Sequence, residues 1–146
     1  MNIPRKRIAE LLGLQERHII IDKADYDPAF PDEIELFKAL DEKDPDFSSH
    51  IAGCAIYPDY AVYKLINQGI RLMIAILYPD LKGIPVGMIE HTKFRGRLYP
   101  GDTIHAVIKK WQERSMIAKF EVAIEDQRGK LAYESTIYGT VVENGK

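Results

Sequence analysis

The stretch that most constrains the fold is Asp59–Leu77, DYAVYKLINQGIRLMIAIL, which follows Pro58 and contains no proline. At about 100° per residue, its apolar side chains would cover most of a helical cylinder. They are Val62, Leu65, Ile66, Ile70, Met73, Ile74 and Leu77. A helix that is apolar on most sides is normally buried, so this stretch predicts a central buried helix about 28 Å long.

A narrow polar stripe interrupts that apolar surface. Spacings of three, four and seven residues place its members on one face of the helix, and they are Lys64, Asn67, Gln68 and Arg71. The stripe could face a cavity or a partner subunit, or it could be the solvated side of a partly covered helix. Because it breaks the apolar run, we expect no membrane-spanning segment here.

The 146 residues predict a single domain, 1–146, that is long enough to bury a core without disulfides. Cys54 is the only cysteine, and the N-terminus does not resemble a signal peptide, so we expect a cytoplasmic protein. The formal net charge of −2 gives no general attraction to nucleic acid.

The N-terminal half predicts short elements. Pro4–Leu12 is expected to form a helix that stops at Gly13, because Pro suits a first turn and Gly a helix end. The β-branched run His18–Lys23 and the alternating run Glu33–Leu40 predict strands. The other segments read as an acidic loop at Asp25–Asp32, an acidic turn at Asp41–Phe47 and an irregular stretch at Ser48–Pro58.

The chain after the central helix predicts long antiparallel strands. They are Ile84–Phe94, bent near Gly87, then Thr103–Gln112, Met116–Asp126 and Lys130–Val142, with turns at Tyr99–Asp102 and Gln127–Gly129. Such strands and one buried helix indicate an α+β fold in which a curved antiparallel sheet wraps the helix. Pairing of an open sheet edge with a second copy would protect that edge, so we expect a homodimer or a higher oligomer.

One segment carries a family resemblance. FSSHIAGCAIYPDYAVYKLINQ is similar to the signature of the β-hydroxyacyl-acyl carrier protein dehydratases, F-x-G-H-F-P-G-x-P-I/V-M-P-G-V-x-x-x-E-A-x-x-Q. The two superimpose without a gap, with identities at Phe47, His50, Gly53, Ile56, Pro58 and Gln68. IIIDK resembles the family's early LLIDR strand, and FRGRLYPGD resembles its FKRPVVPGD segment. The resemblance implies the hotdog fold.

The resemblance also implies a chemistry and a set of site residues. In the family a histidine removes the α-proton of a 3-hydroxyacyl thioester, and an acid on the central helix of the opposite subunit handles the β-hydroxyl. The histidine position is His50, and the acid position is occupied by Lys64. The implied substrate-binding residues are Gly53, Pro58, Asp59 and Gln68. Gln68 would bind a substrate carbonyl or a pantetheine amide, or bond across the dimer.

Two of these positions depart from the family pattern. A lysine at position 64 can donate a proton but cannot hold water as a carboxylate does. It is either a substitute acid or the mark of a lineage that lost dehydratase chemistry. Asp59 stands where the family has a glycine whose backbone N–H helps bind the thioester carbonyl. We expect Asp59 to cap its own helix and to compete for the donors there.

Several functions therefore stay open at the level of sequence. The first is dehydration of an acyl carrier protein or coenzyme A thioester. The alternatives are an acyl thioesterase and a non-catalytic subunit, including one that supplies His50 to an acid-bearing homologue in a heterodimer. Lys93, Arg95 and Arg97 would steer an acidic carrier protein, or they form a solvated strand end. His50, His91 and His105 lack metal-ligand spacing, and we expect no metal and no cofactor.

Overall fold

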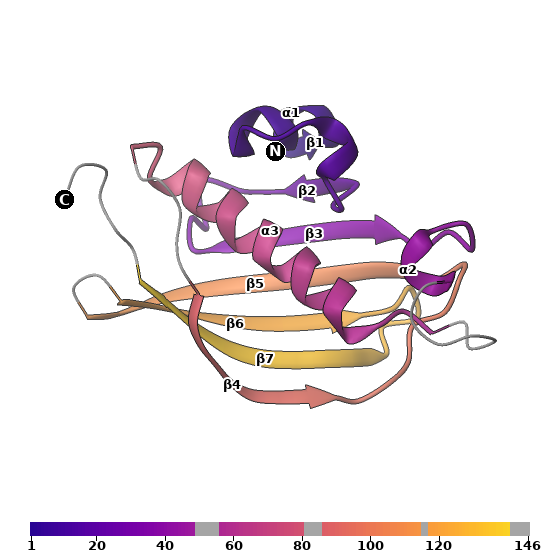
Figure 1. Ribbon diagram of the computed structural model, residues 1–146. Coiled ribbons are helices and arrows are strands. Elements are labelled where there is room, and N and C mark those ends of the chain that lie inside the picture. The colour runs from indigo at the N-terminus through magenta and orange to yellow at the C-terminus, as the bar shows by residue number, and fades with distance from the viewer. Residues whose placement is uncertain (49–55, 81–85, 115–116, 141–146) are drawn as a thin grey trace.

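The computed structural model describes residues 1–48, 56–80, 86–114 and 117–140. A long helix, α3 (Asp59–Leu77), lies across one face of a curved antiparallel sheet (Figure 1). The described part of this sheet has seven strands in the order β1-β2-β3-β5-β6-β7-β4. A short helix, α1 (Arg5–Leu12), sits at the β1 and β2 end of the sheet, beside α3 (Figure 1).

The elements have the following bounds. The strands are β1 (Asn2–Pro4), β2 (Lys23–Asp25), β3 (Glu33–Ala39), β4 (Val86–Phe94), β5 (Thr103–Arg114), β6 (Ile117–Glu125) and β7 (Leu131–Thr140). The remaining helical elements are the 3₁₀ turn η1 (Glu16–His18) and α2 (Pro45–Ser48).

The central helix begins and ends where the sequence predicts. Its backbone comes closest to the sheet at Gly69, where an added Cβ would overlap Leu36 of β3 and lie 2.7 Å from Cδ1 of Ile108 of β5. Both of those side chains are fully buried. In the polar stripe, Lys64 and Asn67 are exposed on the single chain, so α3 is covered on its sheet side and open on the opposite face.

The strand predictions for the C-terminal half are confirmed over the described residues, and the predicted ends Ile84, Met116 and Val142 lie outside them. Along β6 the alternating residues Ala118, Phe120, Val122 and Ile124 are buried beneath the helix. At Tyr99–Asp102 the N–H of Asp102 donates to the carbonyl of Tyr99 at 3.0 Å, and Gly101 has φ 93°. That positive φ is the conformation that a glycine in the third position of such a turn supplies.

Two predictions for the N-terminal half are wrong. The run His18–Lys23 is not a strand, because His18 ends η1 and pairing of β2 starts only at Lys23, on Phe37. Ile19 and Ile21 are buried, but the backbone N–H of Ile20 donates to the side chain of Gln68 instead of to a strand. The acidic turn predicted at Asp41–Phe47 extends too far, because the turn closes where the N–H of Asp44 donates to the carbonyl of Asp41 at 2.9 Å and α2 starts at Pro45.

The described sheet has two edge strands, the three-residue β1 and the nine-residue β4, and the longer one, β4, is called the open edge. It pairs only with β7 among the described strands, with register irregularities between Val86 and Met88 and between Glu90 and Lys93. On this strand Ile89 is 45% exposed and Phe94 is 53% exposed. Their cross-strand partners, Ile137 and Tyr133, are buried. An apolar edge of this kind favours pairing with another strand.

We therefore expect the protein to be at least a dimer at micromolar concentration. Ile89→Lys should shift it toward the monomer, because a charge on an exposed edge opposes strand pairing. Size-exclusion chromatography with light scattering measures this directly. A monomeric wild type would rule out the β4 interface, and Lys109→Glu, on an exposed position of β5, is the control surface change.

Candidate functional site at the start of the central helix

The described members of the expected site lie at the start of α3 and along its first turns. Pro58 is buried and is the N-cap residue, and no side chain caps the helix. Asp59 was expected to be the cap, but it lies one position further on. Its Oδ1 accepts the N–H of Tyr60 at 3.0 Å. The carboxylate therefore uses one donor of the first turn and places negative charge at the positive end of the helix.

His50 and Gly53 lie outside the described residues. On either side of that segment, Phe47 and Tyr57 are buried, and their ring centroids are 5.5 Å apart. The N–H of Tyr57 also donates to the carbonyl of Leu98 at 2.8 Å. The residues on the two sides of the undescribed segment are thus held close together immediately before α3.

Tyr57 places a polar hydroxyl group among the buried side chains of the hydrophobic core. Its hydroxyl is buried and has no hydrogen-bond partner among the described residues. Burial raises the pKa of Tyr57, and the nearby carboxylates of Asp44 and Asp46 raise it further. The phenol therefore stays neutral across the physiological pH range. The family pattern has a methionine at this position, so the substitution changes the chemistry of the helix entrance.

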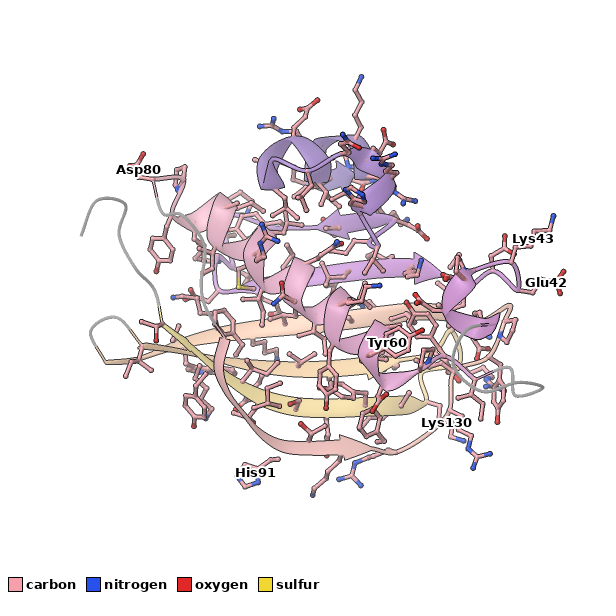
Figure 2. The ribbon with its side chains drawn as sticks, in the orientation of Figure 1. Glu42, Lys43, Tyr60, Asp80, His91 and Lys130 are labelled. Atoms are coloured by element: carbon pink, nitrogen blue, oxygen red, sulfur yellow. The ribbon has the colours of Figure 1, made fainter. Side chains whose placement is uncertain are left out.

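Lys64 occupies the position of the family's acid and is exposed on the open face of α3. Its Nζ lies 5.9 Å from the centroid of the Tyr60 ring, one turn earlier on the helix. Tyr60 stands at the N-terminal end of α3 in Figure 2. A protonated lysine here offers hydrogen-bond donors and no acceptor, so it cannot take the part of an ionised carboxylate.

Gln68 has a structural role that sequence reasoning missed. Its Oε1 accepts the N–H of Ile20 at 2.8 Å, and its Nε2 donates to the carbonyl of His18 at 2.7 Å. Both ends of the amide hold the segment after η1 against the central helix. The sequence held one signal for this structural role, because Gln68 stands at the border between the polar stripe and the apolar face of the helix.

The gap between α3 and the open edge is filled by aromatic rings. Tyr63 of α3 lies 6.5 Å from Phe94 of β4 and 6.1 Å from Tyr133 of β7, measured between ring centroids. Phe94 and Tyr133 are 5.2 Å apart. All three pairs meet edge to face, an arrangement that stabilises aromatic contacts. Sequence reasoning did not single out these residues.

The basic residues at the end of β4 are not equivalent. Arg95 is engaged by Glu134, with its Nη2 2.7 Å and its Nε 2.9 Å from the same carboxylate oxygen. Lys93 and Arg97 are exposed. His91 lies on β4, and its side chain points outward from this edge strand in Figure 2.

Two further properties concern the described residues. No group of three or more histidine, cysteine, aspartate or glutamate side chains there is arranged to hold a metal ion. Within the same ranges, every helix is too short or too polar to cross a membrane.

Comparisons with known proteins find dehydratases that match along nearly the whole chain. The 3-hydroxyacyl-acyl-carrier-protein dehydratase FabZ of Caulobacter vibrioides is 29% identical over 145 residues, covering 94% of this chain and 89% of that protein. FabZ of Rickettsia bellii is 26% identical over 138 residues, covering 92% and 93%. The resemblance to the dehydratases is confirmed. No family model matches the chain.

Solved structures that are similar to this chain confirm the hotdog fold. The PaaI protein of E. coli has a TM-score of 0.66 at 10% identity and covers 93% of this chain and 88% of its own. A hypothetical thioesterase from Streptococcus pneumoniae has a TM-score of 0.65 at 9% identity, covering 84% and 88%. The dehydratase heterocomplex ApeI:P from Xenorhabdus doucetiae has 0.61 at 21%, covering 80% and 93%.

The two hydrogen bonds of Gln68 give a stability prediction. Gln68→Leu leaves the Ile20 N–H and the His18 carbonyl without their partner, which should lower the free energy of unfolding by about 1–3 kcal/mol. Urea unfolding measures the loss. Asn67→Leu, on the exposed neighbouring position, is the control and should change stability by less than about 0.5 kcal/mol. A Gln68→Leu variant of full stability that binds thioester weakly would instead make Gln68 a substrate ligand.

Proposed function

We propose that this protein is a dehydratase-like hotdog subunit that binds 3-hydroxyacyl thioesters and takes part in their conversion to trans-2-enoyl thioesters. The observation that carries the proposal is the similarity to FabZ dehydratases over 94% of the chain. The signature residue Pro58 is the N-cap of α3, and Lys64, at the position of the family's acid, lies in the second turn, which supports a site at that end of the helix.

The proposed chemistry gives the role of the base to His50 and leaves the role of the acid to a partner subunit. The imidazole of His50 takes the proton from Cα, the electrons of that bond form the double bond, and the Cβ–O bond breaks. The oxygen leaves as water once it has received a proton. An acid and a base in such positions each contribute about 10²- to 10⁴-fold to the rate. Lys64 can supply a proton but offers no acceptor that would orient the hydroxyl.

A heterodimer would complete the pair. In the family the histidine and the acid of one site come from different subunits. Pairing this chain with an acid-bearing hotdog subunit would therefore create one site that contains His50 and a carboxylate. The other site would contain the partner's histidine and Lys64. The structural likeness to the ApeI:P heterocomplex supports such an assembly at the level of the fold.

The thioester is proposed to arrive on an acidic carrier protein in the cytoplasm. Lys64, Lys93 and Arg97 are exposed and free to meet such a carrier, whereas Arg95 is engaged by Glu134. The thioesterase alternative has weaker support. Asp59 is the carboxylate nearest the helix start, and it is already bound to the N–H of Tyr60.

The decisive assay follows hydration of crotonyl-coenzyme A and longer trans-2-enoyl thioesters, alone and with an acid-bearing hotdog partner. We expect enoyl absorbance to fall without release of thiol, and His50→Ala to abolish this in the site that it serves. Thiol release would reassign the protein to the thioesterases. Turnover unaffected by His50→Ala would refute the role of His50.

Lys64→Glu tests the missing acid directly. Restoring a carboxylate on α3 should raise the hydratase rate of the protein without a partner by up to about 10²-fold, the lower value for one general acid–base group. Lys109→Glu makes the same charge change on the far side of the sheet and should have no effect. No gain in Lys64→Glu would mean that the pocket differs from the family's at more than this residue.

A further inference from the structure

Four hydroxyl groups converge between the first half of α3 and the strands at the open edge. They belong to Tyr63 of α3, Thr92 of β4, and Tyr133 and Ser135 of β7. The hydroxyl oxygens of Thr92 and Ser135 are 3.0 Å apart and form a hydrogen bond between the two strands. The helix-facing surface of the sheet is otherwise predominantly apolar, so this hydroxyl cluster is a local exception.

Tyr133 is the innermost member of the hydroxyl cluster. The residue is 1% exposed, and its hydroxyl makes no hydrogen bond with any described residue. Burial raises the pKa of Tyr133, while the hydroxyls of Ser135 and Thr92 act in the opposite direction. The hydroxyls of Tyr63, Thr92 and Ser135 are near enough to influence this pKa, but by distance and angle none of them forms a hydrogen bond with the Tyr133 hydroxyl. A buried polar group without a partner is costly and rare, and a bound ligand is one way to satisfy it.

The cover over Tyr133 is thin. Phe94 lies 5.2 Å from it between ring centroids, is the last residue of the edge strand, and is 53% exposed. Tyr63, the other ring against it, is only half-buried and directly precedes Lys64 on the helix. An acyl chain that enters beside Lys64 would therefore reach Tyr133 after displacement of only one partly exposed ring, that of Tyr63 or that of Phe94.

We propose that the hydroxyl cluster, with Tyr133 at its centre, binds the oxygen that an acyl substrate carries on its third carbon. This inference rests on the proposed function and adds to it a group that recognises the substrate. The cluster offers both donors and acceptors, which a hydroxyl ligand needs and which Lys64 alone cannot supply. Tyr133 acts here as a binding residue, and no proton transfer is assigned to it.

The test compares two ligands that differ by one oxygen. Isothermal titration of the protein with 3-hydroxyhexanoyl- and hexanoyl-N-acetylcysteamine should show that the hydroxylated thioester binds about 3- to 10-fold more tightly, as expected for one ordinary hydrogen bond. Tyr133→Phe should reduce this ratio to about one while leaving the affinity for the hexanoyl thioester unchanged. Ser135→Ala removes another hydroxyl of the same cluster and should also lower the ratio of the two affinities.

Thermal unfolding separates binding from folding. Because Tyr133→Phe removes a hydroxyl that has no partner, it should keep or raise the melting temperature. Tyr26→Phe is the matched control: its partly buried hydroxyl donates to the carbonyl of Pro31 at 3.1 Å, so this variant should lose stability and keep the ligand ratio.

The outcomes divide clearly. A wild type that binds both thioesters equally, or a Tyr133→Phe variant that keeps the preference, overturns the role of the hydroxyl cluster and leaves the proposed function standing. Binding of neither thioester by the protein, with or without a hotdog partner, overturns both.

Discussion

The seating of α3 on the sheet is the contact on which the rest of the structure depends. At Gly69 the helix backbone meets Leu36 and Ile108 directly, with no side chain of its own between them. Burial of the apolar face over β3, β5 and β6 removes a large hydrophobic surface from water, and that surface is the main source of stability. The height of the helix above the sheet also determines how much room remains beside it for a ligand.

The predictions that succeeded depended on regular patterns in the sequence. The helix Asp59–Leu77 and the alternation along β6 each repeat one period over many residues, so a local reading was sufficient. The run His18–Lys23 failed for the opposite reason. Its β-branched residues suit a strand, but its hydrogen-bond partner is the side chain of Gln68, which lies 48 residues away from Ile20. No local pattern reveals such a partner.

The site shows the same division between what a motif indicates and what packing decides. The sequence placed Pro58, Asp59, Lys64 and Gln68 at the start and along the first half of the central helix, and the structure has them there. The signature said nothing of Tyr63, Phe94 and Tyr133, because these rings come from three elements that meet only in the folded chain. The open face above them, with an exposed lysine and an unpaired sheet edge, is a surface that a second subunit would enclose.

Gln68 has a consequence for how such signatures are used. A residue that fastens the N-terminal segment to the central helix is under selection for folding, whether or not the chain still catalyses a reaction. It would persist in a chain whose acid position, one turn earlier, holds another residue, as position 64 holds a lysine here. Counting this glutamine toward a catalytic signature therefore overstates activity in divergent hotdog proteins, and the residue one turn earlier is the better diagnostic.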